Sequence, residues 1–157
     1  MREFPLIEVR PYQASDLDGV IDVFLRAVRE IASDDYNSKQ IESWAQVDRE
    51  EWAIARMNRP TWVAMSDDKI AGFIDLHTNG LIDMLFVNPD FARKGVATSL
   101  LARVEAEAGE ARLRVLHTYA SITAHSFFEK CGFTTLLTRN VSVRDQKFIQ
   151  CVMEKML

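Results

Sequence analysis

A short junction between a strand pattern and a helix pattern constrains the fold of this chain more than any other feature. Residues 81–87 form an apolar run, which the turn-forming sequence Asn88-Pro89-Asp90 ends. Gly95 then opens a segment, residues 96–108, in which apolar side chains recur at helical spacing, and residues 113–120 return to a strand pattern. We therefore expect a strand, a loop, a helix and a second strand in direct succession.

The segments on either side of this unit complete an α/β pattern. Strand-like runs and helical periodicity follow one another along the chain, separated by turn residues. Further strands are expected at residues 7–10, 62–65, 70–76, 134–143 and 148–154, and further helices at residues 15–28, 40–44, 51–57 and 123–130. We predict one α/β (α+β) domain over residues 1–157, with a mixed, mostly antiparallel sheet and helices on both of its faces.

Composition and charge argue against several classes of protein. With a formal net charge of −4, the chain lacks the basic balance of a protein that binds nucleic acid through its phosphates. No apolar run approaches the roughly 18 residues that a membrane span needs. The first six residues lack the apolar core of a secretory signal, so we expect a cytoplasmic protein that does not act at a membrane.

The histidines and cysteines predict no metal site. Cys131 and Cys151 lack the spacing of a ligand pair, which favours buried thiols. His77, His117 and His125 are separated by whole secondary-structure elements, so structural or surface roles are the simpler interpretation.

The junction at residues 89–98 suits a bound phosphate. The start of a helix exposes backbone N–H groups and the positive end of the helix dipole, and both favour an anion. The small residues Gly95 and Ala97 would let ligand oxygens approach the backbone, while Arg93 and Lys94 add positive charge. A plain tight turn explains the same residues. The loop lacks Gly-x-Gly-x-x-Gly and Gly-Lys-Ser/Thr, which argues against nicotinamide and nucleoside triphosphate ligands.

The sequence resembles the GCN5-related N-acetyltransferase (GNAT) superfamily. Its best signature is Gln/Arg-x-x-Gly-x-Gly/Ala after a strand that ends in Val-x-Pro, and residues 87–97 match it except for Ala92 at the first position. A second motif, Asn-x-x-Ala-x-x-Phe-Tyr-Glu-Lys-x-Gly-Phe, is similar to residues 121–133. The order of elements matches that fold over nearly the whole chain. Residues 36–44 and the pair Phe127-Phe128 resemble a narrower branch, the YafP-like bacterial proteins.

The resemblance implies a GNAT-like fold, in which two neighbouring parallel strands splay apart around acetyl-CoA as co-substrate. It implies that the backbone of Leu85, Phe86 and Val87 binds the pantetheine and that the loop binds the pyrophosphate. The loop residues are Arg93, Lys94, Gly95, Val96, Ala97 and Thr98. Ser121 occupies the asparagine position of the second motif near the cofactor. Phe128 occupies the position of a tyrosine that protonates the leaving thiolate in many relatives.

The resemblance also indicates catalytic residues for acetyl transfer to an amine. A free alkylamine has a pKa of about 10.4 and is therefore protonated near neutral pH. The site needs a base that removes a proton and produces the neutral nucleophile. Asp83 resembles the acidic position that many relatives carry, and Asp75 is a second candidate. A solvated or hydrogen-bonded strand aspartate is the alternative for each. Tyr119 is a candidate acid, although an aromatic residue on a central strand is also typical of a core.

Loop residues are expected to form the wall that contacts the acceptor. Tyr36 and Trp44 could line an aromatic pocket or could pack the neighbouring helices together. His77 lies at the end of the strand that carries Asp75 and is the third candidate.

Two functional hypotheses follow. The first is an acetyl-CoA-dependent N-acetyltransferase that transfers an acetyl group directly to a primary amine of a small molecule or a protein, within a ternary complex. The second is a catalytically weak or inactive acyl-CoA-binding module, which the replacement of the family's tyrosine by Phe128 favours. We predict no metal and no nucleic acid partner, and either a monomer or a homodimer.

Overall fold

The structure is a computed structural model that describes residues 6–157. Residues 1–5, on which the prediction of no secretory signal largely rests, lie outside the described residues. The elements are β1 (Glu8–Pro11), α1 (Leu17–Arg26) continued by a π-helical turn (Ala27–Ile31), α2 (Ser38–Trp44), α3 (Arg49–Asn58), β2 (Thr61–Ser66), β3 (Lys69–Asp75), β4 (Leu81–Ile82), β5 (Leu85–Val87), α4 (Val96–Glu110), β6 (Val115–Ala120), α5 (Ile122–Lys130), β7 (Thr134–Val143) and β8 (Gln146–Met156). The α/β fold class is confirmed.

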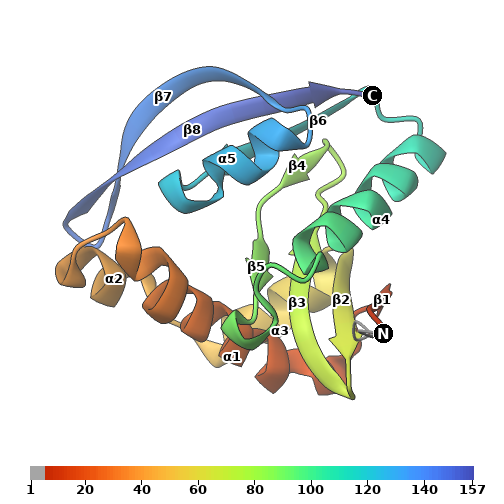
Figure 1. Cartoon of the computed structure of the whole chain (residues 1–157), viewed down its shortest axis with the longest axis horizontal. Coiled ribbons are helices and arrows are strands. Elements are labelled where there is room, and N and C mark those ends of the chain that lie inside the picture. Colours follow the sequence, from red (N-terminus) through yellow and green to blue (C-terminus); the bar gives the residue numbers. More distant parts are fainter. Residues whose placement is uncertain (1–5) are drawn as a thin grey trace, which may run out of the picture.

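The strands form two four-stranded sheets that meet at β4 and β5 (Figure 1). The first sheet has the order β1-β2-β3-β5 and is antiparallel throughout. The second has the order β4-β6-β8-β7, in which β4 and β6 are parallel and the other pairs are antiparallel. Because β4 pairs with β6 while β5 pairs with β3, the two strands of the expected parallel pair separate after residue 82.

The sequence predicts one continuous strand over residues 81–87, and this prediction is wrong in that the strand is broken between Ile82 and Leu85. The break has a side-chain cause. The carboxylate Oδ1 of Asp75 accepts hydrogen bonds from the backbone nitrogens of Asp83 and Met84, each at 2.9 Å. A regular antiparallel ladder would pair these amides with backbone carbonyls and would alternate their directions.

Helix α4 packs tightly against the first sheet. A Cβ atom added to Gly72 on β3 would lie 2.8 Å from the carbonyl oxygen of Phe86 and 2.8 Å from a methyl group of Val96. The glycine therefore allows β3, β5 and the first turn of α4 to approach one another closely. Leu100 and Val104, both fully buried, continue this contact along the helix.

The long β7–β8 hairpin arches across the molecule and ends beside α2 (Figure 1). Three hydrogen bonds fasten its turn there. Ser43 Oγ donates to the carbonyl of Val143 (2.7 Å), Arg144 Nη1 donates to the carbonyl of Ser43 (2.8 Å), and Gln40 Nε2 donates to the carbonyl of Lys147 (2.8 Å). We call residues 141–148 with α2 the strap.

None of the helices in residues 6–157 combines the length and the apolar character that a membrane span requires.

Candidate functional site

Two cavities border successive residues of β5, where the sheets separate. The larger, about 350 Å³, is lined by residues of β5, β6, α5 and the strap, and we call it the strand cavity. The smaller, about 230 Å³, is lined by Val87 and by the loop and first turn that precede and open α4, and we call it the loop cavity. Both cavities share β5 and α5 as walls, so an elongated ligand lying along β5 would contact both.

The loop cavity is built for an anion. Gly95 caps α4 in the left-handed conformation (φ 82°), and a Cβ atom added there would meet nothing within 4 Å. The first helical hydrogen bond runs from Ser99 N to the carbonyl of Gly95 (3.0 Å). The amides of Val96, Ala97 and Thr98 precede that bond and so have no acceptor within the helix. These donors, together with the positive end of a 15-residue helix, line the loop cavity.

The two basic residues of the loop take different positions. Arg93 adopts a left-handed backbone conformation (φ 60°) and lines the loop cavity. Lys94 does not line it, and its Nζ lies 5.5 Å from the centre of the Phe91 ring. Of the pair, Arg93 is thus the better placed to contact a phosphate in the loop cavity.

Strand β5 offers a free backbone edge toward the strand cavity. On its other edge, Asp75 N donates to the carbonyl of Met84 (3.0 Å) and Asn88 N donates to the carbonyl of Ala71 (2.8 Å). Hydrogen-bonded pairs alternate along an antiparallel ladder, so the N–H and C=O groups of Leu85 and Val87 point away from β3. An extended ligand can add to this edge as a further strand.

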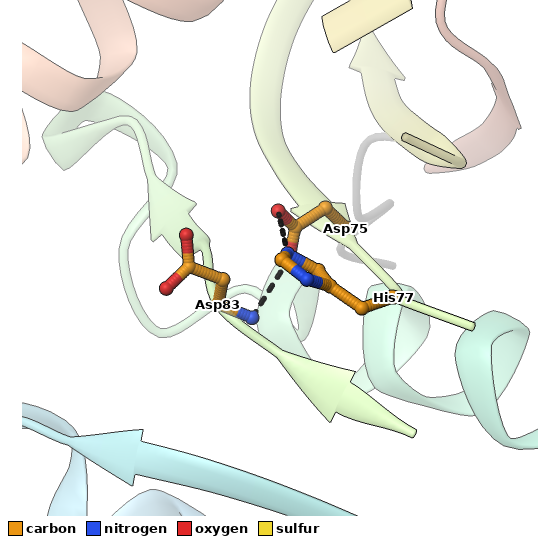
Figure 2. Close-up of side chains that lie close together, drawn as sticks. All are labelled: Asp75, His77 and Asp83. Atoms are coloured by element: carbon orange, nitrogen blue, oxygen red, sulfur yellow. Dashed lines mark hydrogen bonds and ion pairs between the residues drawn. The ribbon is translucent and has the colours of Figure 1, made fainter. Parts of the chain in front are cut away.

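Asp83 is the carboxylate that faces the strand cavity. Its side chain is 40% exposed, and one oxygen lies 3.7 Å from Arg59 Nη1. Figure 2 shows this carboxylate pointing away from Asp75 and His77, although the backbone nitrogen of Asp83 points toward Asp75. Tyr119 lines the same cavity at 39% exposure, with the Arg139 guanidinium 4.5 Å from its ring centre. The structure therefore brings Asp83 and Tyr119 to one cavity.

Asp75 is buried behind that cavity and has no exposed surface. Besides the two amide donors at Oδ1, its Oδ2 accepts hydrogen bonds from Nη1 and Nη2 of Arg56, both at 3.2 Å, and the Arg56 side chain is equally buried. Burial raises the pKa of Asp75, while the amide of Met84 and the charge of Arg56 act in the opposite direction. With every lone pair directed at a protein donor, Asp75 fits a structural role better than a role as base.

His77 lies beside Asp75 rather than in the strand cavity. Its Nε2 is buried, 3.6 Å from Asp75 Oδ2, and has no hydrogen-bond partner among the described residues. Asp75, His77 and Asp83 each place one potential ligand atom within 4.8 Å of the others (Figure 2). The oxygens of Asp75 are already taken by two amides and a guanidinium cation, so the donor set does not favour a metal ion. The absence of a metal stays a prediction.

Ser121 and Tyr36 meet at the start of α5. Ser121 Oγ accepts a hydrogen bond from Ala124 N (3.2 Å) and caps the helix, while the Tyr36 hydroxyl accepts one from Ile122 N (2.9 Å). Burial raises the pKa of Tyr36. Both side chains line the strand cavity, Tyr36 being held by a hydrogen bond that fixes its ring.

Comparisons with known proteins decide the family. A model of the acetyltransferase (GNAT) domain matches residues 32–155, which is most of the chain. The chain belongs to the GNAT family of acetyltransferases. The GNAT fold and the acyltransferase class expected from the two motifs are thereby confirmed.

Individual GNAT relatives agree with this assignment. The chain is 38% identical over 142 residues to the uncharacterized N-acetyltransferase YafP of Escherichia coli K12, covering 90% of this chain and 91% of that protein. Its structure resembles that of a GCN5-related N-acetyltransferase of Rhodopseudomonas palustris (described as an aminotransferase, class II), with a TM-score of 0.93, 29% identity and coverage of 100% and 98%. PaiA N-acetyltransferase of Thermoplasma acidophilum, solved with coenzyme A, shares the fold at a TM-score of 0.75 with 21% identity and coverage of 97% and 99%.

The GNAT site contains residues that sequence reasoning did not single out. Phe24, Trp52 and Phe148 line the strand cavity beside the predicted Trp44. Their rings form two pairs, with centroids 5.0 Å apart for Phe24 and Trp52 and 6.1 Å apart for Trp44 and Phe148. The Phe86 ring connects the pairs, 5.0 Å from Phe24 and 6.2 Å from Trp44. Helical spacing marks Phe24 as an inward-facing residue, but only the fold shows that this face borders a cavity. Nothing in the sequence indicates that Arg56 belongs near the site. Charged residues are seldom fully buried, so an arginine in a helix is expected at the surface.

Phe128 replaces the tyrosine of the common GNAT pattern, and its ring is part of the site. Its ring is 2% exposed, lines the strand cavity and packs edge-on against Phe133 at 5.0 Å. The position thus keeps the shape of an aromatic residue but supplies no hydroxyl group.

Proposed function

We propose that this protein transfers the acetyl group of acetyl-CoA to the nitrogen of a primary amine. The observation that carries the proposal is the arrangement along β5, where an anion-binding loop, a free strand edge and a cavity with an exposed carboxylate follow one another. A pyrophosphate at the loop and a thioester beside Asp83 would be joined by an extended arm. Acetyl-CoA has these three parts in this order.

The residues of the loop and of β5 fit coenzyme A. The amides of Val96, Ala97 and Thr98 would hold the pyrophosphate, with the Arg93 guanidinium as counter-charge. The free N–H and C=O groups of Leu85 and Val87 would pair with the amides of the pantetheine arm. Gly95 suits this position because it borders the loop cavity and its positive φ would strain any residue with a side chain.

Asp83 is the base in this proposal. Its exposed carboxylate removes a proton from the bound ammonium group, directly or through a water molecule. The neutral nitrogen then forms a bond to the acetyl carbon while the C–S bond breaks and sulfur keeps the electron pair. The nitrogen loses two protons in all, the sulfur regains one, and the net reaction releases one proton. Transfer is direct, since the amine and the thioester occupy the same cavity.

The leaving group is the step at which this chain differs from the common pattern. We propose Tyr119 as the acid, because it lines the strand cavity and is partly exposed. Its hydroxyl group would donate a proton to the sulfur. A thiol with a pKa of about 8.5 also leaves tolerably as a thiolate. Phe128 favours the second candidate function, a module that binds acyl-CoA without turnover, because its ring fills the acid position without a proton to give.

The acceptor is proposed to be a small amine with an apolar body. Tyr36, Trp44 and Phe148 form an aromatic wall of the cavity that Asp83 also lines, and the last two belong to the strap. An ammonium group near Asp83 and an apolar body against the rings would satisfy both halves of the cavity. His77 does not line the strand cavity and is not part of the proposed acceptor site.

Calorimetry and steady-state kinetics test the proposal. Coenzyme A should bind the purified protein, and binding should weaken by at least about tenfold when Gly95 is replaced by a branched residue. With an amine that supports turnover, initial rates over a grid of both substrate concentrations should give intersecting double-reciprocal lines, as a ternary complex requires. Parallel lines would indicate a covalent acetyl-enzyme and would contradict direct transfer. Binding without turnover for any amine would support the module.

A further inference from the structure

We infer that the buried Asp75–Arg56 pair positions the Leu85 amide against the thioester carbonyl by fixing the break between β4 and β5. The inference rests on the proposed function. Asp75 and Arg56 act through the backbone in this account, and neither touches a substrate.

The contacts of Asp75 define where the chain changes sheets. The backbone N–H groups of Asp83 and Met84 both donate to Oδ1 of Asp75. In a regular strand, the N–H groups of two neighbouring residues would point in opposite directions. Ile82 therefore still pairs with β6 whereas Leu85 already pairs with β3. A single carboxylate oxygen holds the two-residue step between the sheets.

Arg56 holds that carboxylate in place. Its guanidinium donates two hydrogen bonds to Oδ2 and a third, longer one of 3.4 Å to Thr61 Oγ1, and neither side chain of the ion pair is exposed. Arg56 comes from α3, whose Trp52 lines the strand cavity. The pair thus links the helix beside the acceptor wall to the point where the strands separate.

The break determines which amide faces the thioester. After it, Leu85 is the first residue of β5 whose N–H group points away from β3. An N–H donor at this point of the cavity can bind the acetyl carbonyl oxygen and stabilise the negative charge that develops on it. Without the carboxylate, residues 83–85 could continue as a regular strand and turn this N–H group elsewhere.

Calorimetric titration with two probes, acetyl-CoA and coenzyme A, tests for this hydrogen bond. Coenzyme A lacks the acetyl carbonyl that would accept it. We expect the wild type to bind acetyl-CoA about fivefold more tightly than coenzyme A, the factor of one ordinary hydrogen bond. Asp75→Asn should bring this ratio close to one and leave the Kd for coenzyme A within about twofold, since the loop cavity is unchanged. The Leu85 amide resonance should shift on addition of acetyl-CoA in the wild type only.

Rescue and a matched control separate positioning from general stability. In the double variant Asp75→Asn/Arg56→Gln, the new side-chain carbonyl can accept from Asp83 and Met84 while its NH₂ group donates to the new glutamine, so the ratio should recover in part. Asp16→Asn removes the carboxylate of another ion pair, with Arg10 (2.8 Å), away from the cavities. It should lower thermal stability and leave the ratio as in the wild type.

Each other outcome counts against the inference. An unchanged ratio in folded Asp75→Asn, or a wild type that binds both probes equally, overturns it and leaves the proposed function standing. If neither probe binds the wild type, the proposed function fails and the inference with it. If Asp75→Asn does not fold, Arg56→Lys takes its place, since it keeps the cation with fewer donors, and an unchanged ratio in that variant overturns the inference.

Discussion

At the scale of single residues, the proposed mechanism depends on the difference between Asp83 and Asp75. Both lie where the sheets separate, yet one carboxylate is 40% exposed in the strand cavity and the other is buried against four donors. The sequence placed both among the candidates because strand position alone cannot tell an exposed aspartate from a paired one. The deciding partner, Arg56, lies 19 positions earlier in the chain and on a helix.

Replacing Asp83 by asparagine should impair the chemistry and spare cofactor binding. Loss of a general base lowers kcat by about 10²-fold or more, while the Kd for acetyl-CoA should stay within about twofold. Thiol release with a saturating amine measures the first, and calorimetry measures the second. Asp68→Asn, in the exposed turn between β2 and β3, is the matched control and should match the wild type. A pH–rate profile that Asp83→Asn leaves unaltered would remove Asp83 as the base.

Gly95, which caps α4, and Gly109, near the other end of that helix, form a natural comparison. Each has open space around an added Cβ atom, but only Gly95 has a positive φ and borders the loop cavity. Gly95→Val should weaken coenzyme A binding by at least about tenfold, because the side chain occupies phosphate space and strains the cap. Gly109→Ala should leave binding unchanged and slightly raise the melting temperature. Equal affinities of the two variants, measured by calorimetry, would place the pyrophosphate elsewhere.

At the scale of elements, most of the fold follows from local patterns. The helical period of residues 96–108 corresponds to α4, and the strand runs on its two sides correspond to β4 with β5 and to β6, within a few residues. The strand break at residues 83–84 could not be read in the same way, because a side chain distant in sequence replaces the backbone partners of two amides. The π-helical turn at Ala27–Ile31, which continues the first helix beyond its predicted end, likewise left no sign in the apolar spacing.

The strap gives a prediction about acceptor binding. Ser43→Ala removes the donor to the Val143 carbonyl, a bond worth about 1 kcal/mol, and should loosen the hairpin end from α2. We expect faster hydrogen exchange at residues 141–148 and a severalfold higher KM for the amine, with an unchanged Kd for acetyl-CoA. Ser142→Ala, one position along the exposed hairpin, provides the control. An acceptor KM that does not change would show that the strap does not border the acceptor.

At the scale of the whole molecule, ion pairs that link elements stabilise the folded state in addition to the apolar core. Asp16 accepts hydrogen bonds from Arg10 at 2.8 Å and 3.0 Å, and from Gln13 N at 2.8 Å, which joins β1 to the start of α1. The Arg10 hydrogen bonds hold the pKa of Asp16 below its ordinary value of 3.8.

The prediction of a single domain over residues 1–157 stays a prediction.

Stability should therefore depend on pH through Asp16. A carboxylate whose pKa is lower in the folded state stabilises the fold fully above its unfolded pKa and loses that contribution as the pH falls through the folded pKa. Asp16→Asn should lower Tm by about 3 °C at pH 7. Thermal melts of wild type and variant should converge as the pH is lowered below 3.8. A constant difference in Tm across this range would contradict the role of the ionised pair.

The central claim is transfer of an acetyl group to an amine, and mass spectrometry of the acceptor tests it most directly. The protein is incubated with acetyl-CoA and a panel of small primary amines, from polar to aromatic. We predict that amines with an apolar body gain one acetyl group on nitrogen as coenzyme A appears in equal amount, and that Asp83→Asn abolishes most of this product. Tight binding of acetyl-CoA with no acetylated amine across the panel would contradict the claim and identify a binding module.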